Sequence, residues 1–393
     1  MPVTPTHSTE VKPRFQEFAV SQLQIGMYVD SILSQSGKAE LKQSGRIGKA
    51  EHIEILRKKG VLTVKVDWQR SKVEQPKDAE EKSPESKVKN VAAAKRMFQE
   101  AKSLQSKYFQ QLRQGEPIDL QEMEEIASGL VDALGEFSEA LMVLSKLRAK
   151  DKYLLEHSLN VGMLLAYFGR YLGMERDVQS QLVMGGMLHD IGKINTPDAI
   201  LHKPGRLTEA EFVVMREHVV HSRLILEKQE GISQIMMDVA ANHHEHIDGN
   251  GYPRHLKEDQ LSIYSRMATL VDVYDALTAD RVYKSGMPPT KAFGILLKGS
   301  GSQFETGLLE KFIRCMGVYP IGTLVQLKSG RLGFVTNRHA SKPMRPTLRL
   351  VYNAKTSMHI EVVDLDLSKT PHDEIEAAVS ARDFGLDIQN YVQ

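Results

Sequence analysis

The stretch His189-Asp190-Ile191-Gly192-Lys193 opens a segment that closes with His243-His244-Glu245-His246-Ile247-Asp248-Gly249-Asn250-Gly251-Tyr252-Pro253. Seven of the 14 histidines fall within this segment, which is about a sixth of the 393-residue chain. Imidazole is the commonest protein ligand for transition metals, and a neighbouring carboxylate adds an anionic oxygen that can bridge two ions. The segment therefore predicts a polynuclear metal site that carries out hydrolysis.

Helical patterns surround this segment, and they predict an all-α central region from Asp151 to about Tyr319. Apolar residues recur at helical spacing in five stretches and two shorter ones: Lys152–Leu172, Asp177–His189, Thr208–Lys228, Ile232–His246, Ser262–Ala279, Ala292–Leu297 and Gly307–Met316. Thr208 with Glu211 forms a capping box, and Thr196-Pro197 predicts an N-cap followed by a proline at the first helical position.

Two further candidate ligands lie outside the opening segment. His157 falls in the first of these helices, and Asp272 falls in the middle of Leu270-Val271-Asp272-Val273-Tyr274. An acid in so apolar a setting is costly to bury unless it is paired, and coordination of a shared metal by several helices would offset that cost. A lone histidine in a helix is more often an ordinary core or surface residue, and we place four in that class: His202, His221, His246 and His255.

Taken together in order, these motifs resemble the HD-GYP signature. His189-Asp190 with Lys193 matches its first half, and Gly251-Tyr252-Pro253 matches its second half. HD-GYP proteins are a branch of the HD phosphohydrolase superfamily whose members hydrolyse cyclic dinucleotides, chiefly cyclic di-GMP, in bacterial second-messenger signalling. The resemblance covers roughly residues 150–317 and includes Lys203-Pro204-Gly205 and Arg266–Arg281.

The resemblance implies a role for each matching residue. The implied metal ligands are His157, His189, Asp190, His218, His243, His244 and Asp272, with Asp190 as the bridging carboxylate. Lys193 would reach the scissile phosphate and act in catalysis with Asp190. Tyr252, Arg281 and Lys284 would hold the nucleotide, together with Lys193.

One departure from the family pattern bears on the number of metals. Some members carry a glutamate four residues before the first ligand histidine, where it helps to hold a third metal, and this chain has Tyr153 there. Glu156 is adjacent to His157, about 100° round the helix, and should point elsewhere. We therefore expect two divalent transition metals. Mixed histidine and carboxylate ligands suit iron or manganese, with zinc, nickel or cobalt as substitutes in vitro.

The expected reaction is hydrolysis of cyclic di-GMP by a hydroxide that bridges the two metals. Two-metal sites in the family tend to stop at linear pGpG, whereas three-metal sites continue to GMP. Three other functions stay open: a phosphodiesterase for 3′3′-cyclic GMP-AMP, a non-catalytic cyclic-dinucleotide receptor, and an HD enzyme acting on a linear nucleotide. The Gly-Tyr-Pro half argues against the last, and the full ligand set argues against the receptor.

The remainder of the chain predicts smaller parts around this HD-GYP catalytic domain of residues 151–319. We expect a disordered leader at 1–14, a small α+β regulatory module at 15–70, a charged linker at 71–90, connecting or dimerisation helices at 91–150, and a small, mainly β domain with a C-terminal helix and tail at 320–393. The 15–70 module is similar to a poorly characterised domain that is often fused ahead of HD-GYP domains.

Composition excludes several classes of partner. The 51 basic and 50 acidic residues give a net charge of +1, which does not favour a nucleic-acid polymer as partner. The single cysteine, Cys315, fits a reducing compartment, and no run of about 18 apolar residues or signal peptide is present. We expect a cytoplasmic protein with no membrane partner, whose partners are the cyclic dinucleotide, signalling proteins and a second copy of the chain.

Overall fold

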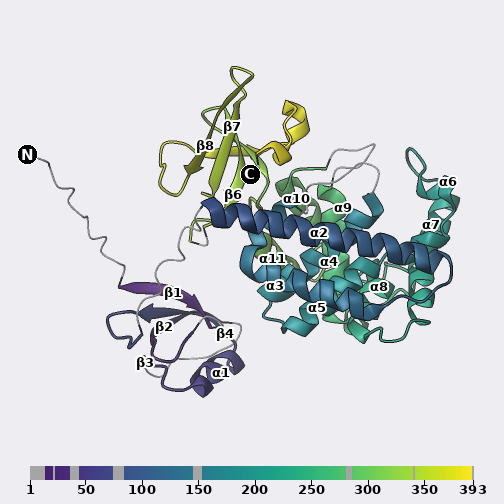
Figure 1. Cartoon of the computed structure of the whole chain (residues 1–393), viewed down its shortest axis with the longest axis horizontal. Helices are drawn as coiled ribbons and strands as arrows, with labels where there is room; N and C mark the ends of the chain where they lie inside the picture. Colours follow the sequence, from purple (N-terminus) through teal and green to yellow (C-terminus); the bar gives the residue numbers. More distant parts are fainter. Residues whose placement is uncertain are drawn as a thin grey trace, which may run out of the picture. The chain divides into compact units, whose positions relative to one another are not determined.

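The computed structural model describes residues 14–20, 23–35, 44–73, 84–144, 153–279, 286–339 and 341–391. The chain divides into two compact units, Met1–Ser83 and Pro84–Gln393, and each is described by itself (Figure 1). Arg281 and Lys284, predicted as nucleotide-binding residues, lie outside the described residues. Among the helices of the described ranges, none combines the length and apolarity that a bilayer crossing requires.

The first unit is the predicted α+β module. Its sheet has the strand order β1-β4-β2-β3 and carries one helix: β1 Phe15–Ala19, β2 Tyr28–Gln35, β3 Gly45–Arg46, α1 Ala50–Lys58 and β4 Val61–Asp67. All paired strands are antiparallel. Strands β1 and β2 follow each other along the chain but are not neighbours, because β4 lies between them. Val64 and Val66 of β4 are fully buried.

The second unit begins with two long helices, α2 Pro84–Arg113 and α3 Leu120–Leu144. The predicted linker at 71–90 is therefore too long at its C-terminal end, because the chain is helical from Pro84 onward. Proline is well suited to the first turn of a helix. The apolar stripe of α3, including Leu130 and Leu134, is buried against α2 and the central helices. A homodimer would therefore have to use another surface.

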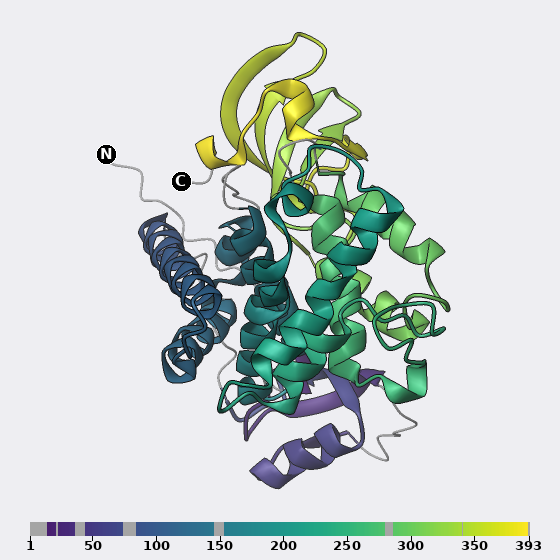
Figure 2. The same cartoon turned by 90° about the vertical axis from the view of Figure 1, so that its right-hand side faces the viewer.

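The central region is helical as predicted (Figure 2). Its elements are α4 Tyr153–Tyr171, α5 Arg176–Leu188, the 3₁₀ helix η3 Ile191–Asn195, α6 Asp198–Leu201, α7 Glu209–Leu226, α8 Gln234–Asn242, the 3₁₀ helix η4 Glu258–Gln260, α9 Ile263–Thr278, α10 Pro289–Lys298 and α11 Thr306–Met316. Helices α4 and α5 approach very closely at Gly162 and Gly186. A Cβ at Gly186 would lie 2.3 Å from Gly162 Cα, so only glycine fits there. This contact brings the end of α5 beside α4.

Local signals set the ends of these helices. Thr208 forms the predicted capping box with Glu211 at the start of α7. The prediction at Thr196-Pro197 is wrong by one residue, because Pro197 is the N-cap of α6 and its first helical residue is Asp198. Proline offers no side-chain oxygen, and accordingly this short helix has no side-chain cap.

The C-terminal part is an antiparallel five-stranded sheet with the order β8-β7-β6-β5-β9. Its strands are β5 Leu324–Leu327, β6 Arg331–Asn337, β7 Thr347–Asn353, β8 Met358–Asp366 and β9 Ile375–Ala378. Strands β5 and β6 form a hairpin. The predicted C-terminal helix is wrong, because Ile375–Ala378 is a strand that pairs with β5. Within the described residues, two short 3₁₀ turns follow it, at Ala381–Phe384 and Ile388–Asn390.

Candidate metal centre

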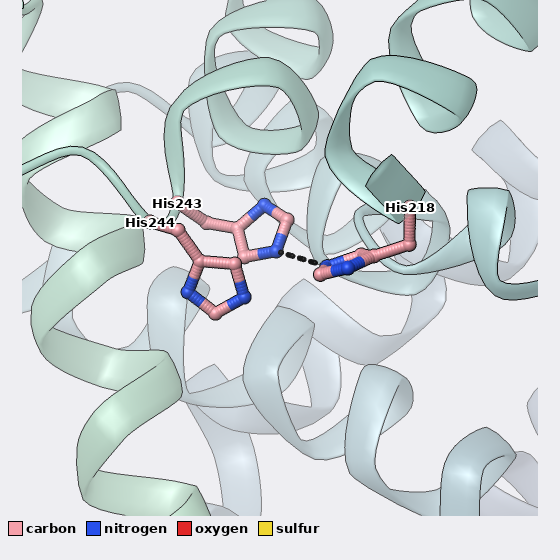
Figure 3. A group of neighbouring side chains, drawn as sticks. All are labelled: His218, His243 and His244. Atoms are coloured by element: carbon pink, nitrogen blue, oxygen red, sulfur yellow. Dashed lines mark hydrogen bonds between the residues drawn. The ribbon is translucent and has the colours of Figure 1, made fainter. Parts of the chain in front are cut away.

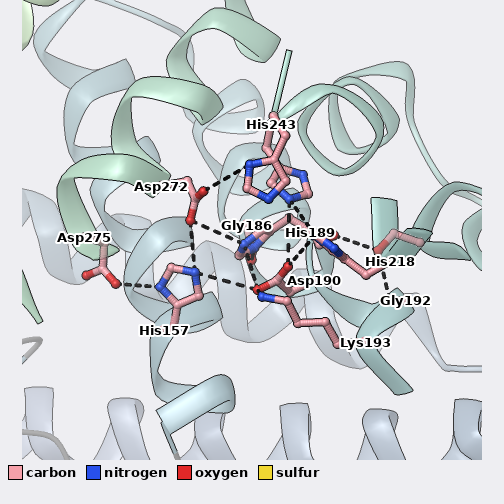
Figure 4. Close-up of polar contacts among 12 residues, drawn as sticks. His157, Gly186, His189, Asp190, Gly192, Lys193, His218, His243, Asp272 and Asp275 are labelled. Carbon is pink, nitrogen blue, oxygen red and sulfur yellow. Dashed lines mark hydrogen bonds and ion pairs between the residues drawn. The ribbon is translucent and has the colours of Figure 1, made fainter. Parts of the chain in front are cut away.

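The seven side chains predicted as metal ligands converge in the interior of the helical region (Figure 4). They come from α4, the end of α5, α7, the end of α8 and α9. Three overlapping groups bring their ligand atoms within 4.8 Å of one another: His157, His189 and Asp272; His189, Asp190 and His243; His218, His243 and His244. All seven are buried except His244, which is partly exposed. The cluster is therefore largely buried and is accessible at His244.

Asp190 lies between two sets of imidazoles. Its Oδ1 is 3.2 Å from His218 Nε2 and 3.8 Å from His243 Nε2. Its Oδ2 is 3.4 Å from His189 Nε2 and 3.7 Å from His157 Nε2. Each oxygen thus faces a different pair of ring nitrogens, which is the geometry that a bridging carboxylate requires.

Asp272, on α9, also has its two carboxylate oxygens near histidines of both sets. Its Oδ1 lies 3.0 Å from His157 Nε2, and its Oδ2 lies 3.8 Å from His244 Nδ1. The carboxylate sits in the middle of α9, whose neighbouring residues are apolar and buried. It therefore faces the cluster as the sequence predicted.

Three of the histidines share one hydrogen-bonding arrangement. The Nδ1 atom lies near the backbone carbonyl oxygen three residues earlier, at 2.7 Å for His189 and Gly186, 2.6 Å for His218 and Met215, and 2.9 Å for His243 and Ala240. A carbonyl only accepts, so Nδ1 carries the proton and the Nε2 lone pair of each ring points into the cluster.

These lone pairs need a cation. His218 Nε2 and His243 Nε2 are 3.3 Å apart and face each other (Figure 3), and His189 Nε2 is buried without a hydrogen-bond partner. Opposed lone pairs repel, and an unsatisfied buried nitrogen is costly, unless a metal ion accepts them. The donor set therefore fits divalent transition metals.

For three of the histidines and for Asp190, burial and neighbouring charges favour the deprotonated form that binds a metal. Burial lowers the pKa of His189 and His243, and it lowers the pKa of His244 to about 3. Burial opposes ionisation of Asp190, but the charge of Lys193 and the adjacent imidazoles hold the pKa of its carboxyl well below the usual value. The Lys193 ammonium donates to Asp190 Oδ2.

Asp275 contacts the proposed ligand His157 and was not predicted as a site residue. Its Oδ2 lies 2.6 Å from His157 Nδ1, on the side of the ring away from the other ligands. A carboxylate in this position orients a ligand histidine and strengthens its basicity. The signal was available, because Asp275 follows Asp272 by three residues and so lies on nearly the same face of α9.

The loop after α8 carries Tyr252 to the cluster. The buried carboxylate of Glu245 accepts hydrogen bonds from the backbone N–H of Arg254 at 2.7 Å and of Leu256 at 3.0 Å. Glycine is required at 251, since a Cβ there would lie 2.3 Å from His246 N. The ring of Tyr252 then lies 4.8 Å from the ring of His244.

The four histidines predicted to be ordinary core or surface residues lie outside these three groups. His202, His221, His246 and His255 belong to none of them. Glu156 points to Lys102 of α2, as its position on the helix predicted. Tyr153 is the first residue of α4, and its side chain lies outside what the structure describes.

Three family models match the chain in succession. An HD domain matches residues 142–308, a domain of unknown function matches residues 16–123, and a KOW domain associated with HD domains matches residues 324–386. The central region matches the HD domain family. These matches confirm the predicted helical HD domain, the preceding domain of uncharacterised type and the following β domain.

Several curated phosphodiesterases are similar to this chain in sequence. The chain is 35% identical to a cyclic di-GMP phosphodiesterase of Pseudomonas aeruginosa over 67% of this chain and 64% of that protein. It is 34% identical to a cyclic di-GMP phosphodiesterase of Thermotoga maritima over 49% of this chain and 52% of that protein. It is 36% identical to a 3′3′-cGAMP-specific phosphodiesterase of Vibrio cholerae over 40% of this chain and 37% of that protein. The chain thus spans less than two thirds of the length of each.

Proposed function

We propose that this chain is a metal-dependent phosphodiesterase that hydrolyses cyclic di-GMP to linear pGpG. The observation that carries the proposal is the position of Asp190, whose two oxygens face two different sets of imidazoles in a buried cluster. The names of the Pseudomonas and Thermotoga relatives support cyclic di-GMP as the substrate.

The ligands would divide into two sets that share Asp190. His157, His189 and Asp272 would hold one ion, and His218, His243 and His244 would hold the other. Iron or manganese suits this mixture of nitrogen and carboxylate donors. Such ions, when bound, lower the pKa of a coordinated water toward neutrality and polarise a phosphoryl oxygen.

The remaining groups of the site act on the substrate. The Lys193 ammonium, held by Asp190 and only partly buried, would donate to a non-bridging oxygen of the scissile phosphate and stabilise its developing charge. The ring of Tyr252 would support the nucleotide beside His244. Arg281 and Lys284 would add two cations for the nucleotide.

The proposal of two metals and of pGpG as the product rests on Tyr153 and Glu156. Glu156 is engaged with Lys102 and is therefore directed away from the cluster. The test is metal analysis of the purified protein together with chromatography of its products from cyclic di-GMP. About two metals per chain and a stable pGpG peak are expected. Three metals with rapid formation of GMP would contradict the proposal, and no cleavage by the metal-loaded protein would refute the function itself.

A 3′3′-cyclic GMP-AMP phosphodiesterase is the second candidate, because a relative from Vibrio cholerae bears that name. Both dinucleotides present the same phosphodiester chemistry to the metals and Lys193, and differ in one base. Parallel measurement of kcat/KM for the two substrates separates these functions. We expect the larger value for cyclic di-GMP.

A further inference from the structure

Arg216 lies at the edge of the metal centre and has no part in the ligand arrangement. It is on α7, two residues before His218, and is exposed. Its guanidinium carbon is 4.4 Å from the ring centre of Phe212 and 5.0 Å from that of Tyr252. Tyr252 in turn packs against His244. A continuous line of contacts therefore runs from this cation to a proposed metal ligand.

Arg216 lies on the same unit as exposed arginines that pair with carboxylates, but within the described ranges it has no such pair itself. By contrast, Arg223 on the same helix pairs with Glu227 at 2.7 Å, and Arg176 pairs with Asp132 at 2.7 Å. The two aromatic rings hold the guanidinium in place without using its N–H donors, which lie in the plane of the group. The cation is thus positioned and available for an anion.

A cyclic dinucleotide supplies such an anion. It carries two phosphodiesters on one ring, and in the proposed function the metals and Lys193 act on the one that is being cut. The second phosphate stays charged and must lie beside the reaction centre, because the ring joins the two groups covalently. Guanidinium binds phosphate through two parallel hydrogen bonds, a geometry that lysine does not offer.

We propose that Arg216 binds the phosphate of the cyclic dinucleotide that is not being cleaved, and so sets the affinity for cyclic dinucleotides over simple phosphodiesters. This inference rests on the proposed function. It makes Arg216 a substrate-binding residue that sits outside the metal ligands, and it assigns to Tyr252 a second role as the support of the guanidinium.

The test is the kinetics of Arg216→Met with two substrates. For cyclic di-GMP, KM should rise on the order of 10- to 100-fold with little change in kcat, because a charged hydrogen bond to bound substrate is lost. For bis(p-nitrophenyl) phosphate, which has a single phosphodiester, both constants should stay unchanged. The KM of Arg216→Lys for cyclic di-GMP should lie between those of the unchanged protein and Arg216→Met, because lysine keeps the charge but lacks the paired donors. Arg223→Met is the matched control on the same helix and should behave as the unchanged protein.

Three results would overturn the assignment. An unchanged KM for cyclic di-GMP would remove Arg216 from the substrate site. An equal loss with bis(p-nitrophenyl) phosphate would show a structural effect on the metal centre. The third concerns salt: KM of the unchanged protein should rise more steeply with ionic strength than KM of Arg216→Met, and equal slopes would assign the contact to a neutral group such as a guanine base. A protein that cleaves bis(p-nitrophenyl) phosphate and leaves cyclic di-GMP intact would instead refute the proposed function.

Discussion

Asp190 has two oxygens that face two sets of imidazoles, so its removal should weaken both proposed metal sites at once. Asp190→Ala is expected to lower hydrolysis of cyclic di-GMP by more than about 100-fold, because neither ion keeps its shared ligand. Bound metal per chain should fall in parallel. Circular dichroism of the variant checks that the helices remain. Full activity of a folded Asp190→Ala protein would show that the site has been placed wrongly.

Asp275 offers a milder change at the same centre. Asp275→Asn keeps the shape of the side chain and weakens its hold on His157 Nδ1. The loss of such a supporting carboxylate typically costs about 10- to 100-fold in metal affinity. Competition with a metal chelator measures this directly. Asp132→Asn, at an exposed ion pair with Arg176, is the control and should leave metal affinity as it was.

His157 makes the stability of the metal-free protein depend on pH. Burial disfavours its charged form, but hydrogen bonds to Asp272 and Asp275 outweigh burial and raise its pKa from 6.5 to about 9. Stabilisation by the charged ring is therefore fully present below pH 6.5 and is lost as the pH rises through about 9. Urea unfolding of chelator-treated protein between these values should show this decline. His157→Gln should remove it, and a decline that persists in the variant would assign the effect to other groups.

Among the elements, α2 contacts the helices of the metal centre beside two proposed ligands. Lys102 of α2 pairs with the buried carboxylate of Glu156, next to His157. Gln105 Nε2 donates to Met187 O at 3.0 Å, two residues before His189. Both contacts lie within two residues of a proposed ligand. The packing of α2 therefore helps to position α4 and the end of α5 at the site.

Lys102→Met should therefore destabilise this unit by about 2 to 3 kcal/mol, because Glu156 loses its cation in a buried setting. Lys107→Met on the same helix removes an exposed pair with Glu122 and should cost less than about 1 kcal/mol. Chemical denaturation of both variants measures the difference. Equal effects of the two substitutions would mean that the buried pair contributes no more than a surface one.

The helices and their caps were predictable from the sequence, because periodicity and capping are local. Thr208 with Glu211 marked the start of α7 correctly. β9 was missed because Glu376-Ala377-Ala378 favours a helix in isolation, whereas pairing with β5 decides its conformation. The convergence of His157, the His189-Asp190 and His243-His244 pairs, His218 and Asp272 could be expected from their motifs. Arg216 was not, since its position over Tyr252 depends on two segments that meet only in the folded chain.

At the scale of the whole molecule, the β domain differs from the helical region in composition, but the two pack together as one unit. Residues 84–393 form one compact unit. Val143 of α3 lies in the same apolar core as Tyr319 and Val325. Arg338, which follows β6, donates to Tyr167 Oη at 2.6 Å and to Cys315 O at 2.8 Å.

Deletion of either end should therefore have unequal effects. A chain that begins at Pro84 should keep its thermal midpoint, because the first unit has its own core of residues such as Val64 and Val66. A chain that ends before Pro320 should unfold at a lower temperature, because Val143 becomes exposed and Tyr167 loses the hydrogen bond from Arg338. Arg338→Met in the full chain should shift the midpoint in the same direction by a smaller amount. If removal of the β domain leaves the midpoint unchanged, contacts such as that of Arg338 with Tyr167 do not contribute to folding.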